Sequence, residues 1–317
     1  MKNSKIKSEI EFIKMISKKP HNKRVVLGIG DDAAVIKSGN QLLVITTDMF
    51  VEKDHFSLDY FYPEDIGIKA MEANVSDIAA MGAKPLYAFI SISLHKKTSA
   101  EFIRSFYNGI YKSAKKHRAD VLGGDTSHGS LMTVNITLIG EVKRRKDLCL
   151  RSDAKTGDLI FVTGKLGAST AGLNLFLKKK KGFDFVKSKH LRPKARMDLS
   201  GKIAEIANAM EDVSDGLASE VRNICLASKK GAVIFAESIP IHSETKKAAE
   251  VLKQNALDYA LFGGEDFELV FTVNKKYAKR AEKLGKLVGK IIKGKKIFLE
   301  KKGRKEELKK FGYDHFA

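Results

Sequence analysis

Two adjacent carboxylates that follow a tight Gly-x-Gly turn constrain this chain more than any other feature. They are Asp31 and Asp32, at the end of the segment Gly28–Asp32, and an apolar run comes next. Neighbouring like charges repel unless a cation lies beside them. No lysine or arginine occurs between residues 25 and 36, so we expect the cation to come from outside the chain, and Mg²⁺ suits hard carboxylate oxygens. A surface β-turn with two solvated aspartates is the alternative.

Other acidic residues also lie in segments without any basic side chain, although the chain has 58 Lys and Arg residues and a net charge of +20. These base-free segments are Ser38–Glu52, Ala70–Ala83, Ala119–Val142, Ile203–Val221 and Gln254–Asn274. Each of them contains Asp or Glu together with Gly, Ser or Thr. Because the acids gather where bases are excluded, we ask whether their carboxylates converge on one site.

Two of these acids are expected where a strand ends. The strand predicted at Leu42–Thr46 stops just before Asp48, and the strand predicted at Ala119–Leu122 stops before a Gly-Gly pair and Asp125. Functional side chains often lie at the end of a buried strand, where they can point into a site. A simple cap on the strand end is the alternative for Asp48.

Two further groups of acids belong to predicted helices. Proline at the start and glycine after the end predict a helix at Pro63–Met81, and small residues surround Asp77 on it. An aspartate on such a face is costly to bury unless it is paired or bound to a metal. Asp212 and Asp215 flank Ser214 before another helix, and two aspartates exceed what helix capping needs.

Length and composition limit the class of protein. A chain of 317 residues suggests two domains, and we expect them at residues 1–146 and 147–317 with a mixed α/β or α+β layered architecture. The two cysteines are far apart and predict neither a disulfide framework nor a zinc site. With no signal-like apolar segment and no run long enough to cross a bilayer, we expect a cytoplasmic protein without a membrane partner.

The net charge raises a second class of function, which is nucleic-acid binding. The densest basic runs are Lys178–Lys181, Lys293–Lys302 and Arg304–Lys310. We interpret them as solvated surface, because no motif of interleaved basic and aromatic residues accompanies them. We therefore expect no nucleic-acid partner, and a basic nucleic-acid-binding protein remains the alternative from a different class.

A convergent set of carboxylates would need divalent cations to stay ionised, and such a set holds nucleotide phosphates through Mg²⁺. The candidates are Asp32, Asp48, Asp77, Asp125, Asp212 and Asp215. No nucleophile–base pair or Gly-x-Ser-x-Gly elbow occurs, so we assign no catalytic nucleophile. Phosphoryl transfer to an acceptor that is already an anion needs none.

Taken in order, these motifs resemble the thiamine-monophosphate kinase family, which belongs to the superfamily of aminoimidazole ribonucleotide synthetase. The motifs are Gly28–Ala34, Thr46–Asp48, His55, Asn74–Gly82, Gly123–Thr126, Asp212–Leu217, Gly263–Glu268 and Gly312–Phe316. The resemblance implies transfer of the ATP γ-phosphate to thiamine monophosphate, giving thiamine diphosphate and ADP. It also implies several Mg²⁺ ions, leaves a role for K⁺ open, and predicts a homodimer whose N-terminal sheets pair into a barrel.

The resemblance also implies roles for individual residues. As Mg²⁺ ligands it implies Asp32, Thr46, Thr47, Asp48, Asp77, Asp125, Asp212 and Asp215. As ATP contacts it implies Tyr107, Gly124, Asp125, Arg151 and Ser214. As contacts to thiamine monophosphate it implies His55, Glu265 and Tyr313.

Related families of the superfamily fit less well. Selenophosphate synthetase would need a reactive cysteine near the N-terminal glycines, and none precedes Cys149. The hydrogenase maturation protein would need a cysteine near its C-terminus, and this chain ends His315-Phe316-Ala317. Another ATP-dependent member, similar to aminoimidazole ribonucleotide synthetase, remains the alternative within the superfamily.

Overall fold

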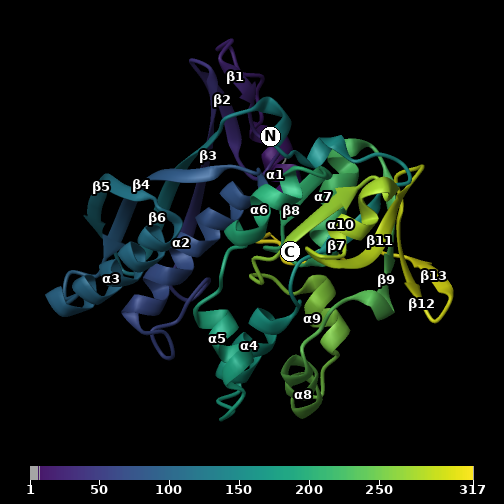
Figure 1. The fold of residues 1–317 in the computed structure, drawn as a ribbon. Coiled ribbons are helices and arrows are strands. Elements are labelled where there is room, and N and C mark those ends of the chain that lie inside the picture. Colours follow the sequence, from purple (N-terminus) through teal and green to yellow (C-terminus); the bar gives the residue numbers. More distant parts are fainter. Residues whose placement is uncertain (1–5, 7, 317) are drawn as a thin grey trace, which may run out of the picture.

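Two mixed β-sheets, each with its own helices, make up the structure (Figure 1). It is a computed structural model that describes residue 6 and residues 8–316. The strands are β1 (Val25–Leu27), β2 (Ala34–Ser38), β3 (Gln41–Val51), β4 (Lys84–Leu94), β5 (Asp120–His128), β6 (Thr133–Val142), β7 (Leu159–Val162), β8 (Ala207–Asp212), β9 (Gly231–Phe235), β10 (Leu269–Val273), β11 (Lys286–Ile292), β12 (Ile297–Lys301) and β13 (Arg304–Glu307).

The helices connect and cover these strands. They are α1 (Glu9–Ile16), α2 (Pro63–Ala80), α3 (Ala100–His117), α4 (Ala168–Leu177), α5 (Asp184–Leu191), α6 (Met197–Ala204), α7 (Leu217–Ser228), α8 (Ser243–Val251), α9 (Ala256–Phe262) and α10 (Ala278–Ala281). Short 3-10 turns are η1 (Arg145–Asp147), η2 (Arg151–Asp153), η3 (Ala236–Ser238) and η4 (Lys275–Tyr277).

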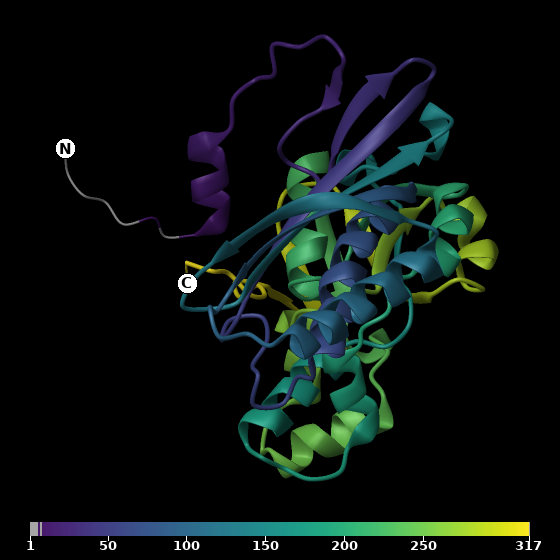
Figure 2. The same cartoon turned by 90° about the vertical axis from the view of Figure 1, so that its left-hand side faces the viewer.

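The N-terminal sheet has the order β1-β2-β3-β6-β4-β5, and only β4 and β5 run parallel. Successive residues of a strand point to opposite faces. In β6 they alternate between buried and partly buried, because α2 packs on one face only. On the other face Met49 and Phe89 remain 56% and 40% exposed. Figure 2 shows this sheet with α1 standing beside it.

Helix α2 is buried over most of its length and joins the two halves of the molecule. It packs against α3 through Gly67, where a Cβ would collide with the carbonyl of Phe106, and Gly109 plays the same part on α3 against Glu64. The far end of α2 contacts β8 and α6, where Ala79 and Ala80 enter the core of the C-terminal half. This helix can therefore present side chains to a site between the halves.

The C-terminal sheet has the order β13-β12-β9-β11-β7-β10-β8, and only β12 and β9 run parallel. Alternation along β7 sends Ile160 and Val162 toward α7, whereas Phe161 packs on Phe271 on the opposite face, with ring centroids 5.7 Å apart. Helices α4, α5, α8 and α9 form a separate group at the bottom of Figure 1. The exposed edge strand β13 consists of charged residues only, which protects this sheet against pairing with other chains.

Most predicted elements are found, but two strands are longer than expected. Helix α2 begins at Pro63, as predicted, and the side chain of Ser99 caps α3 by accepting from Phe102 N. The predictions that strands end before Asp48 and Asp125 are wrong, because both residues lie inside a strand. Asp48 pairs with Ile136 of β6, and Asp125 pairs with Ser91 of β4. Long-range pairing continues these strands through polar residues that would end them locally.

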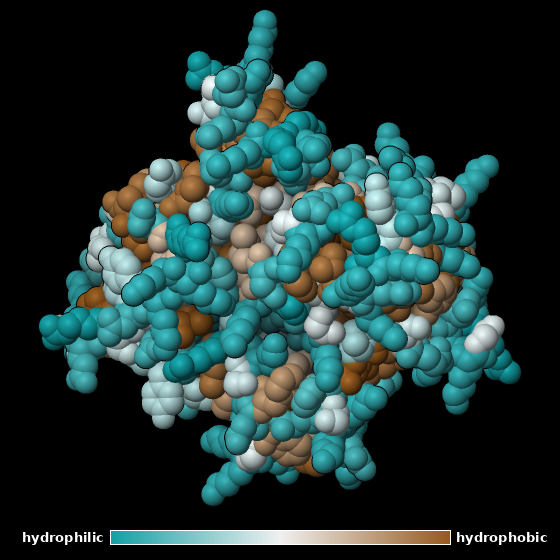
Figure 3. Space-filling model, in the orientation of Figure 1, coloured by the Kyte–Doolittle hydropathy of each residue, from teal (hydrophilic) through white to brown (hydrophobic). Residues whose placement is uncertain are grey.

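The change from one sheet to the other occurs between β6, which ends at residue 142, and β7, which begins at residue 159. The domain boundary expected after residue 146 lies in this interval and stays a prediction. On the face drawn in Figure 3, hydrophilic side chains cover most of the surface and hydrophobic atoms form separate patches. None of the described helices is both long and apolar enough to cross a membrane.

Candidate active site

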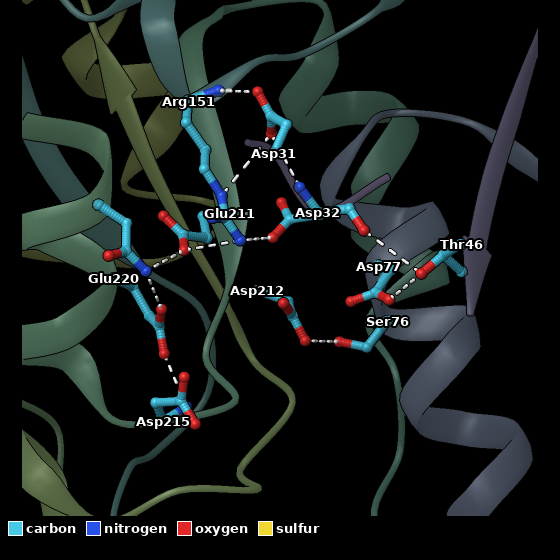
Figure 4. Close-up of polar contacts among 11 residues, drawn as sticks. Asp31, Asp32, Thr46, Ser76, Asp77, Arg151, Glu211, Asp212, Asp215 and Glu220 are labelled. Carbon is cyan, nitrogen blue, oxygen red and sulfur yellow. Dashed lines mark hydrogen bonds and ion pairs between the residues drawn. The ribbon is translucent and has the colours of Figure 1, made fainter. Parts of the chain in front are cut away.

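Three carboxylates from separate elements meet between the two halves of the molecule (Figure 4). Asp32 precedes β2, Asp77 lies on α2, and Asp212 is the last residue of β8. One carboxylate oxygen of each lies within 4.8 Å of the others. We call these three residues the acidic cluster. Thus residues that are 45 or more positions apart in the sequence present oxygens to one small volume.

Hydroxyl groups hold the acidic cluster in place. The hydroxyl of Thr46 donates its single proton to the carboxylate of Asp77 and also lies 3.3 Å from the backbone oxygen of Asp32. Ser76 donates to Oδ2 of Asp212 at 2.7 Å. Thr46 reaches the cluster from β3, on the same face of the strand as Asp48, and Ser76 reaches it from α2, where it immediately precedes Asp77.

No basic side chain neutralises the inner part of this site in the described part of the chain. Asp77 and Asp212 make no ion pair there, and neither does Asp48, which carries the neighbouring charge on β3. Burial, followed by the charge of Asp32, raises the pKa of Asp48 to about 6. Burial and adjacent carboxylates raise the pKa values of Asp77 and Asp212 well above their ordinary range.

This arrangement fits a hard divalent cation. Oδ2 of Asp32 is buried and has no hydrogen-bond partner, and an unpaired buried oxygen of this kind is costly. A cation among the three carboxylates would satisfy that oxygen and remove the repulsion that keeps the pKa values high. Carboxylate and hydroxyl oxygens are the donors that Mg²⁺ takes in proteins.

A different arrangement surrounds Asp31 and Asp32. Arg151, from η2, forms an ion pair with the carboxylate of Asp32 and a second one, of 3.0 Å, with Oε1 of Glu211. The backbone nitrogen of Arg151 donates to Oδ2 of Asp31 at 3.1 Å. The expectation that only an external cation faces the two aspartates is therefore wrong. A guanidinium 119 residues away along the chain reaches them, which no local pattern reveals.

Two buried glutamates belong to the same network and were missed. Asn223 donates to Glu211 at 2.9 Å and to Glu220 at 3.3 Å, and Oε1 of Glu220 accepts from the backbone nitrogen of Asp215 at 2.7 Å. Burial raises the pKa of Glu220 to about 8 and that of Glu211 well above its usual range. Their place in the same base-free segment as Asp212 was the available signal.

A pocket of about 480 Å³ opens beside the acidic cluster. Its lining includes Asp48, Asp77, Asp212, Asp215 and Ser214 on one side. The residues expected to contact thiamine monophosphate also line it, namely His55, Glu265 and Tyr313. The structure thus brings together two sets of residues that the sequence analysis assigned to a phosphate donor's metal and to an acceptor.

The C-terminal segment closes part of this pocket. The hydroxyl of Tyr313 donates to Oδ1 of Asp54 at 3.1 Å, and its backbone nitrogen donates to the carbonyl of Asp215. His55 packs on Phe50, with ring centroids 5.2 Å apart. Burial lowers the pKa of His55, so its imidazole is neutral near pH 7.

Four predicted site residues lie elsewhere in the single chain. Thr47 points to the outer face of the N-terminal sheet, where it contacts Asn135. Asp125 lies on the edge strand β5 and is exposed. Gly124, with φ of 155°, lets β5 approach Ile90, and Tyr107 packs beside Phe106 on α3. Their roles toward Mg²⁺ or ATP stay predictions.

Comparison with known protein families defines the class of protein to which this chain belongs. The family description "AIR synthase related protein, N-terminal domain" matches residues 30–142, and "AIR synthase related protein, C-terminal domain" matches residues 155–302. The chain thus consists of the two domains of AIR synthase related proteins, in a mixed α/β fold.

Individual relatives narrow the class. Thiamine-monophosphate kinase of Bacillus subtilis is 42% identical over 265 residues, which cover 80% of this chain and 79% of that one. The kinase of Buchnera aphidicola from Schizaphis graminum is 38% identical and covers 96% of this chain and 97% of its own. A solved structure, "AaThiL complexed with AMPPCP and TMP", has a TM-score of 0.88 and 34% identity, with 98% and 97% of the two chains covered. The chain belongs to the thiamine-monophosphate kinase family.

Proposed function

We infer that this chain transfers the γ-phosphate of ATP to thiamine monophosphate, giving thiamine diphosphate and ADP. The family membership supports this reaction. The observation that carries it is the acidic cluster at the wall of the pocket, because the cluster suits a nucleotide's cation and the pocket suits a small acceptor beside it. Donor and acceptor phosphates would then meet in one place, which is the main requirement of phosphoryl transfer.

In this proposal Asp32, Asp77 and Asp212 hold Mg²⁺, with Asp48 and Asp215 beside them. The orphaned oxygen of Asp32 and the raised pKa values support the assignment. Bound Mg²⁺ supplies the positive charge that lets these carboxylates ionise and that offsets the charge of the phosphates. Thr46, Thr47 and Asp125 are further predicted ligands, and the number of ions and a role for K⁺ stay predictions.

The chain's own residues position the reactants and supply no nucleophile. The acceptor phosphate is already an anion at pH 7, so no proton has to be removed from it before attack. Both cysteines are buried outside the pocket. Neutral His55, the Glu265 carboxylate and the Tyr313 hydroxyl offer hydrogen bonds to the ring portion of thiamine monophosphate.

Tyr107, Gly124, Asp125, Arg151 and Ser214 are the predicted ATP contacts. Ser214 lines the pocket next to Asp215, which agrees with a place near the transferred phosphate. Arg151 is already engaged by Asp32 and Glu211. Its contribution to ATP binding would therefore include holding Asp32 in position.

We also propose a homodimer in which the N-terminal sheets face each other. The outer face of that sheet exposes Met49, Tyr87 and Phe89 and lies opposite the face on which α2 packs. Thr47 and Asp125 lie on the same face, so a second copy would cover both of them. Light scattering coupled to gel filtration should give twice the mass of the chain. A cytoplasmic location is part of the proposal.

Measurement of ADP release tests the reaction. The purified protein with Mg²⁺ and ATP should release ADP with thiamine monophosphate and not with thiamine, which lacks the acceptor phosphate. Release with the precursor of aminoimidazole ribonucleotide would favour the alternative within the superfamily. Salt-sensitive binding to duplex DNA, with no ADP release, would favour the nucleic-acid alternative.

A further inference from the structure

A fully buried lysine lies behind the wall of the pocket. Lys69 is on α2, and its side chain is only 1% exposed. A buried ammonium group is costly unless its donors are satisfied. Lys69 finds three groups: Oε1 of Glu265 at 2.7 Å, the carbonyl oxygen of His55 at 3.1 Å and the ring of Phe61, with 5.2 Å to the centroid.

Two of those groups belong to residues that line the pocket. His55 follows β3 in the N-terminal half, and Glu265 precedes β10 in the C-terminal half. A single ammonium group therefore connects pocket walls that are contributed by both halves of the chain. The Glu265 side chain remains 27% exposed, so its carboxylate can still contact a ligand while it is bound to Lys69.

The main chain around Glu265 is held firmly, but its side chain depends on few contacts. The backbone nitrogens of Glu265 and Phe267 donate to Ser214 and Val213 at 2.7 and 2.9 Å. Glu265 has φ of 63°, a left-handed conformation that costs free energy and needs such support. Its carboxylate meets only Lys69 and Nδ1 of His190, at 3.6 Å, among the described ion pairs.

His190 is not a substitute for the lysine. It is buried, its Nδ1 lies 3.2 Å from the hydroxyl of Ser169, and burial lowers its pKa well below the usual range. It is therefore neutral, and the positive charge that faces the Glu265 carboxylate comes from the Lys69 ammonium group. Without that charge the carboxylate would be free to turn into the pocket or into solvent.

We propose that Lys69 is a positioning residue, whose ammonium group fixes the Glu265 carboxylate and the His55 carbonyl so that the pocket recognises the ring portion of the acceptor. The proposal rests on the proposed function, because that function assigns Glu265 and His55 to thiamine monophosphate. Lys69 itself does not line the pocket, so it acts through these two residues.

The first test compares Lys69→Met with Lys112→Met. Lys112 lies on α3, and its Nζ is 2.9 Å from Glu64 on α2, but this ion pair is exposed. We expect Lys69→Met to raise KM for thiamine monophosphate about tenfold or more and to leave KM for ATP within about twofold. Lys112→Met should change neither. A purely structural role would lower the active fraction or shift both KM values equally, and that result would overturn the proposal.

A double-mutant cycle shows whether Lys69 acts through Glu265. In the Glu265→Gln background we expect Lys69→Met to raise the KM for thiamine monophosphate by no more than about threefold, because only the contact with the His55 carbonyl is then lost. Multiplied effects would overturn the proposal. The double variant also leaves no unpaired buried charge, so it should fold even where Lys69→Met does not, and its comparison with Glu265→Gln then decides the matter.

The wild-type enzyme separates this proposal from the function on which it rests. A wild type that releases no ADP with thiamine monophosphate would overturn the proposed function together with the role of Lys69. An active wild type whose Lys69→Met variant keeps both KM values would overturn the role of Lys69 alone. Isothermal calorimetry with thiamine monophosphate should reproduce the loss of affinity without turnover.

Discussion

The two halves of the acidic site neutralise their carboxylates in different ways. Around Arg151, one guanidinium faces Asp31, Asp32 and Glu211. Around Asp77 and Asp212, hydroxyl groups are the hydrogen-bond donors. Both groups of acids are buried, so burial alone does not distinguish them.

The difference separates acids that help to hold the fold together from acids that are available to bind a cation. Where the chain supplies its own cation, Arg151 pairs with carboxylates from segments that are far apart in sequence, although burial still raises the pKa values of Asp31 and Glu211. Where it supplies none, no ion pair offsets the burial and mutual repulsion of Asp77 and Asp212 among the described residues, and a cation that binds there gains their full attraction. Asp32 belongs to both groups, since one oxygen faces Arg151 and the other has no partner.

The largest expected effect is on activity, and it comes from the acids around Asp77 and Asp212, which have no basic partner among the described residues. Asp212→Asn should lower kcat/KM about 10³-fold or more, because it removes a ligand of the Mg²⁺ that offsets phosphate charge. The metal-free variant should melt no lower than wild type, since it loses like-charge repulsion. Asp120→Asn, at an exposed position of β5, is the control. Wild-type turnover in Asp212→Asn would show that the acids without a basic partner are not needed for the reaction.

The next largest expected effect is on stability, and it comes from the acids that pair with Arg151. Arg151→Met should lower the free energy of unfolding by about 3–5 kcal/mol, because it leaves buried carboxylates unpaired. Arg280→Met removes an exposed ion pair of 2.8 Å with Glu205 and should cost at most about 1 kcal/mol. Denaturant titrations measure both. Equal losses would mean that Arg151 does not have the architectural role assigned to it.

The pH dependence of stability gives a further test, because it reports the raised pKa values of the buried acids. Burial raises the pKa of Asp48 and Asp215 to about 6 and that of Asp31 to about 7, against 3.8 in the unfolded chain. The folded state therefore binds these protons more tightly, so its stabilisation is complete below pH 3.8 and is lost as the pH rises through 6 and 7.

The measurement is a melting curve series in EDTA and in Mg²⁺. Between about pH 5 and about pH 8 the melting temperature in EDTA should fall, and Mg²⁺ should reduce that fall, because the cation favours the ionised carboxylates. Asp48→Asn should fall less steeply than wild type in EDTA. A melting temperature that rises over this range in EDTA would contradict the assigned pKa shifts.

The smallest effect comes from a single hydroxyl. Ser76→Ala removes the 2.7 Å hydrogen bond to Asp212, and Ser113→Ala removes a 2.8 Å hydrogen bond to Glu72. Both serines are buried on helices, so each substitution should cost about 1–2 kcal/mol of stability. Only Ser76→Ala should weaken Mg²⁺-dependent turnover, by about three- to tenfold. An equal loss of activity in both variants would remove the special role of Asp212.

Much of the fold follows from local patterns. The start of α2 at Pro63 and the cap of α3 at Ser99 follow from preferences of single residues at helix ends, which act over one turn. The ends of the strands could not be predicted in this way. Strands β3 and β5 continue through Asp48 and Asp125 because hydrogen bonds from neighbouring strands, remote in sequence, extend them. A pattern read along one segment does not contain those partners.

Part of the site was also predictable. The segment without Lys or Arg around Asp32 and the base-free segments that contain Asp77 and Asp212 indicated acids that converge, whereas Asp125, from another base-free segment, does not join them. Arg151 and Lys69 were different. Each pairs with a carboxylate that is far away in the sequence, and no periodic pattern connects the two positions. In the sequence, nothing distinguishes Lys69 from the many other lysines.

The amino-acid sequence by itself determined which local elements carry acids and where bases are absent, because turns, caps and charge spacing depend on near neighbours. Only the tertiary structure decided which acids meet, which of them receive Arg151 or Lys69, and which, like Asp125, stay on an outer face. Burial is the physical reason. The pKa of a carboxylate and its need for a cation depend on what the whole fold places around it, and that environment comes from segments far away along the chain.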